Sequence, residues 1–399
     1  MRRDLPLLVA TSAALSWSLL TSGCGQPAEP KVSAPAASPP ASASSPSAAP
    51  SVALSAAPSG PAARPGWRGA LAFEPTPLAG VPDGKVLRSV FFVDDTTLLV
   101  RADDEAVLCD MASWRCALPL PSGLTDWTAS ADGRWLAAND KDATVLFDAK
   151  TGKEARRLVP RKEAQGDTLA LSVTGDQLLV TTSPDIDKLH FEVWSTDAAS
   201  TAPLRKIDLK QIVPWFDATL TPASEVAAFV ERNGHNLMVE KRKEQRTPFL
   251  PPERFVFSPD RTAAIIAGVT MERGAGIQIY RLPEGTEGTH FDAGSFPIDP
   301  SSGDHAYTRE ITTSRGGARV AITIAAKNQP MSVVVFDGQD GHVIARLDKM
   351  PGTIESDLKP LLSPDGKDLL WVRPRPPGAT GAGPQAGESS YEIVRASLP

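Results

Sequence analysis

Cysteine spacing is the first feature of this sequence that could carry chemistry. Cys109 and Cys116 flank the short segment DMASWR, and apolar residues lie on its outer sides. This pattern predicts a β-hairpin, in which cross-strand neighbours lie close enough for a disulfide. We expect a structural disulfide between Cys109 and Cys116, because the N-terminus described below indicates export to an oxidising compartment. Two free thiols are the alternative, and a metal site is disfavoured because a nearby third ligand is lacking.

The third cysteine, Cys24, follows a segment typical of secretory signals. Two arginines near the start precede an apolar stretch from Leu5 to Leu20, and small residues come immediately before Cys24. The segment resembles the bacterial lipoprotein signal, in which a small residue precedes the modified cysteine, as Gly23 does here. The resemblance implies a lipidated Cys24 after cleavage of residues 1–23. An ordinary signal with a cysteine near its cut is the alternative.

The same N-terminal region predicts the cellular location of the protein and a tether between its lipid anchor and its folded domain. Gly25 stands where an aspartate often retains lipoproteins in the inner membrane, so we expect a lipid-anchored envelope protein in the outer membrane, periplasmic or surface-facing. Alanine, serine and proline dominate residues 26–65, and such a segment buries too little apolar surface to offset its ordering entropy. We therefore expect a lipidated cysteine and disordered tether over 24–65, followed by one domain over 66–399.

Motifs for catalysis or metal binding are missing from the sequence. It contains no GxSxG motif, glycine-rich phosphate loop or EF-type calcium loop. The histidines are far apart, and none stands in an HxxxH or HxxE spacing: His190, His235, His290, His305 and His342. We expect no catalytic residue, no metal and no cofactor. The formal charge of -6 also disfavours nucleic acid as a partner, because phosphate binding needs a basic footprint.

A repeated unit fills the rest of the sequence. A short apolar strand, a turn rich in Ser, Pro, Asp or Gly, and a second apolar strand recur seven times. The strand pairs span 89–102, 126–140, 169–183, 216–230, 255–269, 296–310 and 360–373. Third strands follow in the same order as AVLCD, TVLFD, FEVWS, NLMVE, IQIYR, SVVVFD and YEIVR. The spacing matches the period of four-stranded propeller blades.

The stretches SADGRWLA, VLFDAKTGKEARRL, SPDGKDLLW and VVVFDGQDGHVIARL resemble bacterial propellers with WD-like repeats, including the propeller of the Tol periplasmic system. The resemblance implies an all-β fold, a seven-bladed β-propeller of four-stranded antiparallel blades, with six to eight blades as the range. The last repeat has no fourth strand after YEIVR, so we expect the apolar segment GALAFEP (69–75) to fill that place and close the ring.

Two long connections suggest a binding surface. We read 311–330 as an insertion in the sixth blade and 374–390 as an insertion in the seventh, which would place both on one rim. Arginines near them form the candidate binding rim: Arg309, Arg315, Arg319, Arg373 and Arg375. Tolerated loops without a function are the alternative.

These features together favour a noncatalytic protein-binding or scaffolding module at the cell envelope. Its partner would be an envelope protein or glycan, and its contact with the membrane would be the lipid anchor. A propeller hydrolase or lactonase with an axial site is the alternative, and a subunit of an envelope assembly is a third possibility. Side chains that converge on the central channel would favour the enzyme, whereas a basic or apolar rim would favour binding.

Overall fold

The computed structural model describes the following residues: 76–82, 84–140, 143–158, 168–181, 190–197, 199–200, 202–208, 216–222, 227–231, 236–240, 245–246, 250–269, 275–292, 307–325, 332–347, 360–374 and 391–399. All of them belong to one compact unit, residues 61–399. The predicted signal, Cys24 and the tether 24–65 lie outside the described residues. No helix long and apolar enough to cross a bilayer occurs in the described ranges.

Six four-stranded antiparallel sheets form blades 1 to 6 in sequence order. Blade 1 contains β1 (Leu87–Phe92), β2 (Thr97–Ala102), β3 (Glu105–Asp110) and β4 (Arg115–Leu120). Blade 2 contains β5 (Thr125–Ala129), β6 (Trp135–Asp140), β7 (Ala143–Asp148) and β8 (Glu154–Leu158). Blade 3 contains β9 (Thr168–Leu171), β10 (Gln177–Thr181), β11 (His190–Ser195) and β12 (Arg205–Asp208).

The second half of the ring repeats this arrangement. Blade 4 contains β13 (Phe216–Leu220), β14 (Ala227–Glu231), β15 (Asn236–Val239) and β16 (Gln245–Arg246). Blade 5 contains β17 (Leu250–Phe257), β18 (Ala263–Val269), β19 (Ala275–Arg281) and β20 (Thr286–Asp292). Blade 6 contains β21 (Tyr307–Thr313), the 3₁₀ turn η2 (Arg315–Gly317), β22 (Arg319–Ala325), β23 (Ser332–Asp337) and β24 (Val343–Leu347). The last sheet contains β25 (Leu361–Leu362), β26 (Asp368–Pro374) and β27 (Tyr391–Ser397).

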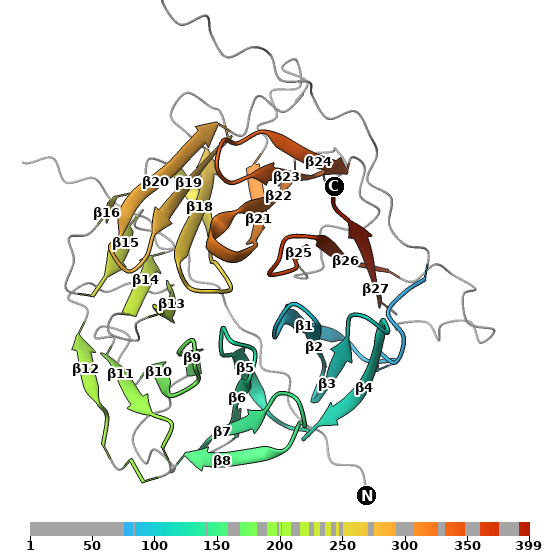
Figure 1. Cartoon of the computed structure of the whole chain (residues 1–399), viewed down its shortest axis with the longest axis vertical. Helices are drawn as coiled ribbons and strands as arrows, with labels where there is room; N and C mark the ends of the chain where they lie inside the picture. The colour runs from blue at the N-terminus through green and yellow to red at the C-terminus, as the bar shows by residue number, and fades with distance from the viewer. Residues whose placement is uncertain are drawn as a thin grey trace, which may run out of the picture. The chain divides into compact units, whose positions relative to one another are not determined.

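The architecture is an all-β propeller, in which the sheets follow one another round a ring (Figure 1). The prediction of seven four-stranded blades is corrected: six blades have four strands, and the last sheet has three among the described residues. Each sheet joins its strands in sequence order, as short antiparallel connections require. The predicted all-β fold and the third strands of all seven repeats are confirmed.

Apolar runs in the inner strands form the cores between sheets. Leu98, Leu99 and Val100 of β2 are consecutive and all fully buried, because blade 1 packs against a neighbour on each of its faces. Each hydrophobic cluster joins two adjacent sheets, for example blades 1 and 2 or blades 5 and 6. One cluster contains Ile393 of β27 together with Leu98 of β2, so the last sheet packs directly on blade 1.

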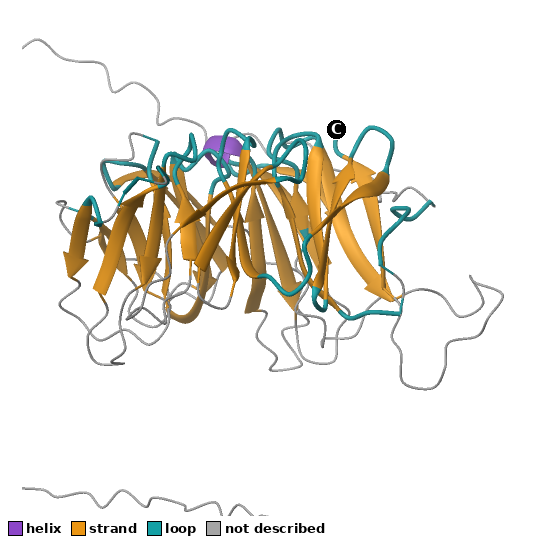
Figure 2. Ribbon diagram, turned by 90° about the horizontal axis from the view of Figure 1, so that it is seen from below, coloured by secondary structure: helices purple, strands orange, loops and turns teal. Residues whose placement is uncertain are grey.

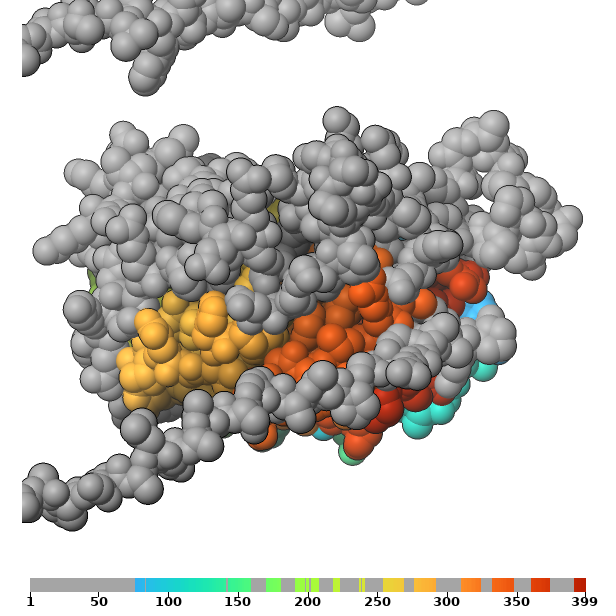
Figure 3. Space-filling model, turned by 90° about the horizontal axis from the view of Figure 1, so that it is seen from above, coloured from blue at the N-terminus to red at the C-terminus, as the bar shows by residue number. Residues whose placement is uncertain are grey.

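The seam between the last sheet and blade 1 includes an upstream segment. The amide of Leu78 donates to the carbonyl of Ile393 at 2.8 Å, and Ala79 forms a parallel bridge with Arg115 of β4. The red last sheet and the blue-green first blade also lie side by side in Figures 1 and 3. The predicted closing strand 69–75 lies outside the described residues, but the residues shortly after it contact both sides of the seam.

The sixth repeat departs from the prediction. Residues 296–310 were expected to form its first strand pair, but this pair is β21 and β22, which span 307–325. The segment 311–330 is therefore not an inserted loop, because most of it is a hairpin through η2. Gly316 and Gly317 supply its turn with φ angles of 60° and 73°, which glycine adopts at little steric cost. In the last sheet, the predicted insertion 374–390 lies outside the described residues except for Pro374.

Candidate functional site on the turn face

One face of the ring is built from the turns between first and second strands and between third and fourth strands. We call it the turn face. Figure 2 shows most of the described loops at this end of the strands, with η2 in purple among them. Hydrogen bonds connect turns of neighbouring sheets on this face. The amide of Asp132 donates to the carbonyl of Val173, and the amide of Arg315 donates to the carbonyl of Pro364.

A buried serine braces five of these turns. Its hydroxyl oxygen accepts the amide five residues later at 2.8 to 3.0 Å, in the pairs Trp135 to Ser130, Gln177 to Ser172, Ala263 to Ser258, Arg319 to Ser314 and Asp368 to Ser363. In four turns the same hydroxyl donates to a turn aspartate, at 2.6 or 2.7 Å in the turns of Ser130, Ser172 and Ser363. Serine and aspartate stabilise turns in this way because their short side chains reach nearby backbone groups. The turn face therefore consists of rigid, repeated turns.

Arg261 breaks the glycine pattern of these turns. Gly133, Gly175 and Gly366 occupy the fourth turn position with φ between 72° and 76°, and Arg261 occupies it in blade 5 with φ of 62°. All four make the same turn hydrogen bond to the serine carbonyl. A left-handed conformation is unfavourable for a residue with a Cβ, so the arginine side chain must compensate elsewhere.

The Arg261 side chain reaches across the ring. Its Nη1 donates to Oγ1 of Thr219 in β13 at 2.5 Å, and its Nη2 donates to the carbonyl of Ala129 in β5 at 3.1 Å. Blade 5 and blade 2 lie on opposite sides of the ring (Figure 1), so the second bond spans the region of the axis. Arg261 thus joins three blades at the turn face.

The turn η2 makes a second set of connections. Arg315 Nη1 lies 2.7 Å from Oδ2 of Asp95 in blade 1, and the Gly316 amide donates to Oδ1 of Asp260 in blade 5 at 3.0 Å. Burial alone would raise the pKa of Asp260, but hydrogen bonds from the Gly316 amide, Ser258 and Thr262 outweigh it and lower the pKa below its ordinary value. We refer to Arg261 and η2 together as the axial bridge. It connects blades 1, 2, 4, 5 and 6 and the last sheet.

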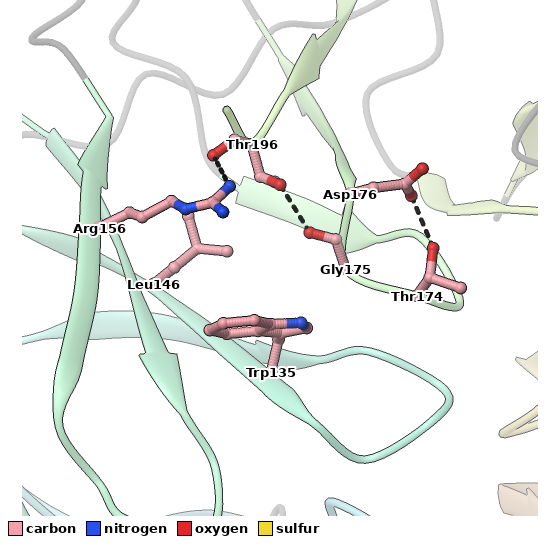
Figure 4. A pocket seen from close by; sticks show the side chains of 7 residues that line it. All are labelled: Trp135, Leu146, Arg156, Thr174, Gly175, Asp176 and Thr196. Atoms are coloured by element: carbon pink, nitrogen blue, oxygen red, sulfur yellow. Dashed lines mark hydrogen bonds between the residues drawn. The ribbon is translucent and has the colours of Figure 1, made fainter. Parts of the chain in front are cut away.

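A preformed pocket lies between blades 2 and 3 on the same face (Figure 4). Its volume is about 120 Å³, and its lining consists of Trp135, Leu146, Arg156, Thr174, Gly175, Asp176 and Thr196. Arg156 Nη1 donates to the Thr196 carbonyl at 2.7 Å, and Thr196 Oγ1 donates to the Gly175 carbonyl at 2.8 Å. The first bond joins the outer strand of blade 2 to blade 3 and fixes the guanidinium beside the cavity, and the second lies within blade 3.

A small acidic cluster lies in the turn between β23 and β24. Ligand atoms of Asp337, Asp340 and His342 lie within 4.8 Å of one another, and both carboxylates already accept backbone amides. His342 Nδ1 lies 2.6 Å from Oδ1 of Asp340. The equivalent turn of blade 2 has the same bracing around Asp148 without a histidine. The carboxylates of Asp337 and Asp340 therefore brace this turn, as Asp148 does in blade 2.

The structure separates the residues of the predicted arginine rim. Arg315 and Arg319 lie on the turn face, where Arg319 donates to the carbonyls of Gly366 and Pro399. Arg373 lies at the far end of β26, where it pairs with Glu392 of β27. Arg309 lies within β21, and Arg375 lies outside the described residues. Arg315 and Arg319 therefore lie at one end of the strands, and Arg373 lies at the other.

The predicted disulfide is confirmed. Cys109 and Cys116 are bonded and face each other across β3 and β4. Both residues are buried, and the amide of Cys116 donates to the Ala79 carbonyl at 2.8 Å. The disulfide hairpin therefore lies at the ring seam.

Sequence reasoning missed the axial bridge and the pocket. Ala129 and Arg261 are 132 residues apart, and no local pattern predicts such a contact. One signal was available: blade 5 reads SPDR where the last sheet reads SPDG, so an arginine replaces a turn glycine. Asp95 belongs to this bridge, whereas Asp104, nine residues later in the sequence, pairs with Lys85 on the opposite face.

Comparison with known proteins bears on the fold alone. No family model matches the sequence, and no curated protein matches it. Among solved structures, the β-propeller domain of Cps50 (Swd1) from Myceliophteria thermophila is similar, with a TM-score of 0.50 and 12% identity over 81% of this protein and 99% of that domain. Hydrazine synthase from Kuenenia stuttgartiensis gives a TM-score of 0.39 and 15% identity over 63% of this protein and 74% of its own length. The protein is thus similar in fold to a WD-type β-propeller domain.

Proposed function

We propose that this protein is a noncatalytic protein-binding module, attached to the cell envelope through Cys24, and that the turn face is its binding surface. The observation that carries the proposal is the axial bridge. Arg261 and Arg315 connect turns from opposite parts of the ring, so these turns are fixed before any partner arrives. A surface that is already ordered loses less conformational entropy on binding, which favours affinity.

Exposed cations on the turn face of blade 2 would contact the partner. Lys150 and Lys153 are exposed in the turn between β7 and β8, and neither forms an ion pair with another described residue. Charged groups at the edge of an interface mainly raise the association rate. By contrast, Lys85 and Arg88 at the opposite end of blade 1 are both engaged with carboxylates. We therefore favour an acidic protein surface as the partner.

Charge neutralisation on the two faces tests this proposal. Lys150→Gln with Lys153→Gln should reduce the association rate of envelope proteins with the purified propeller by several-fold and make it less dependent on salt. Lys85→Gln with Arg88→Gln removes the same charge from the opposite face and should leave the rate unchanged. Equal rates for the two double variants, measured by surface plasmon resonance, would contradict binding through the turn face.

The envelope anchor has a separate test. Cys24→Ser removes the thiol that carries the lipid, but it leaves the described propeller unaltered. The variant should appear in the soluble envelope fraction as a folded protein, whereas the parent sediments with membranes after a high-salt wash. Retention of Cys24→Ser on the washed membranes would contradict anchoring through this residue.

A further inference from the structure

The pocket between blades 2 and 3 combines an apolar floor with an available cation. The indole of Trp135 lies beneath the cavity, with Leu146 beside it (Figure 4). Leu146 is 2% exposed and Trp135 is half-buried, so the floor is held by the core of the ring. An engineered protein cavity of about 150 Å³ takes up one benzene molecule. At about 120 Å³, this pocket has room for one apolar side chain.

The polar side of the pocket selects a negative group. Arg156 uses Nη1 to bond the Thr196 carbonyl, which fixes the guanidinium plane, and its Nε and Nη2 have no acceptor among the described residues. A guanidinium with two adjacent free N–H groups matches a carboxylate in bidentate geometry. The carboxylate of Asp176 also belongs to the pocket residues, but it points away from the cavity and is held by Ser172 and Thr174. Within the described part of the protein, it does not pair with Arg156.

These two properties specify one kind of occupant. The C-terminal residue of a protein carries a carboxylate close to its own side chain, so an apolar terminal residue can place its side chain on Trp135 and its carboxylate on Arg156. We infer that the pocket between blades 2 and 3 binds the C-terminal residue of a partner protein, an apolar residue with a free carboxylate. This inference rests on the proposed function and assigns the partner's anchoring group.

Short synthetic peptides test the inference on the full Cys24→Ser protein. The probes are acetylated tripeptides that end in Val, Leu or Phe, each with either a free carboxylate or a C-terminal amide. Isothermal titration calorimetry should detect binding of at least one free-carboxylate peptide and a loss on the order of ten-fold for its amide, because a hydrogen bond to a charged group is lost. The same peptide ending in alanine should also bind more weakly, because it leaves the Trp135 floor uncovered.

Two arginine variants make the test specific. Arg156→Gln should weaken the free-carboxylate peptide about ten-fold and bind acid and amide equally. Arg157→Gln is the matched control, since Arg157 is the next residue of β8 and pairs instead with Asp140 and Glu154. It should keep the parent's preference for the acid. Circular dichroism should show that both variants are folded.

Three results would overturn the inference: no binding of any free-carboxylate peptide at millimolar concentration, equal binding of acid and amide to the parent, or an equal loss in Arg156→Gln and Arg157→Gln. An acidic side chain as the true ligand would be recognised by tight binding of amidated peptides that contain Glu or Asp. The proposed function fails separately, since it depends on the Lys150 and Lys153 variants and a protein partner. If the lysine variants lose partner binding but the parent binds none of the peptides, the proposed function stands and the inference about this pocket is wrong.

Discussion

Replacing Arg261 tests whether one side chain holds the ring together across its axis. Arg261→Ala removes the bonds to Thr219 and Ala129, and hydrogen bonds to charged groups contribute about 1.5–3 kcal/mol each. Because the guanidinium is only half-buried and such contributions are not additive, we expect Arg261→Ala to lower the free energy of unfolding by about 2–4 kcal/mol. The fully buried Thr219 hydroxyl, left without this donor, accounts for part of the loss.

Arg261→Gly separates the lost contacts from the backbone strain. Both variants lose the guanidinium, but glycine removes the left-handed penalty of about 1–2 kcal/mol per residue. It also makes the unfolded polypeptide more flexible, which costs about 0.4–1 kcal/mol. We therefore expect Arg261→Gly to be about 0.5–1 kcal/mol more stable than Arg261→Ala and less stable than the parent.

The assay is urea unfolding of the Cys24→Ser protein, followed by circular dichroism and tryptophan fluorescence. Coincident curves from the two signals would justify a two-state free energy, and similar m-values would show that the folded states are equally compact. Lys150→Ala on the same face is the control and should change stability by less than about 0.5 kcal/mol. If Arg261→Ala were as stable as the parent, the Arg261 side chain would not stabilise the ring. If Arg261→Ala and Arg261→Gly were equally stable, the left-handed backbone of Arg261 would carry no strain.

Three further predictions concern the seam and the turns. Replacing Cys109 and Cys116 by alanine should lower the free energy of unfolding by about 2 kcal/mol, because the bridge closes a short loop; unchanged denaturant midpoints would contradict this. Burial alone would raise the pKa of Asp365, but hydrogen bonds from Lys367 and Ser363 outweigh burial and lower this pKa from 3.8 to about 2. The stabilising effect of the ionised Asp365 carboxylate is therefore present above pH 4 and is lost as the pH falls to about 2. Asp365→Asn should thus be less stable than the parent at pH 7 and equal to it near pH 2, and a pH-independent difference in midpoint would argue against that pKa. Deleting 66–75 should lower the melting temperature, because we propose that these residues close the ring, whereas deleting 26–60 should not; equal melting temperatures would count against ring closure by that segment.

The sequence was most informative where local chemistry repeats. Turns such as SADG (130–133) and SPDG (363–366) could be recognised because Ser, Asp and Gly act through their own backbone neighbours. The apolar third strands were equally clear, since strands buried on both faces appear as continuous apolar runs. The disulfide followed from a hairpin of the right length between two apolar runs.

The sixth repeat shows where this reasoning fails. The segment DPSSGD (299–304) has strong turn composition, whereas the real hairpin turn, SRGGA (314–318), contains neither Asp nor Pro. Its two glycines supply the left-handed conformations that other turns obtain from one glycine. The shifted hairpin then placed Arg315 and Arg319 in a supposed insertion, whereas they lie in the turn η2 and at the start of β22.

Long-range contacts could not be derived from local patterns at all. The pair of Arg315 and Asp95 joins positions 220 residues apart, and the pocket depends on how blades 2 and 3 pack against each other. The residues around Asp95 in the sequence give no sign of this ion pair, because its partner lies far away in the sequence. Closure of the ring brings such residues together, and closure is a property of the whole repeat array.

Site-specific photo-crosslinking in intact envelopes tests the central claim most directly. A photoreactive amino acid would replace Lys150 or Gln339, which are exposed on the turn face in blades 2 and 6, or Asp104, which is exposed at the opposite end of blade 1. We expect protein adducts from the two turn-face positions and none from Asp104, with the crosslinked partner identified by mass spectrometry. Adducts from Asp104 together with none from Lys150 and Gln339 would show that the partner binds the opposite face and would contradict the account.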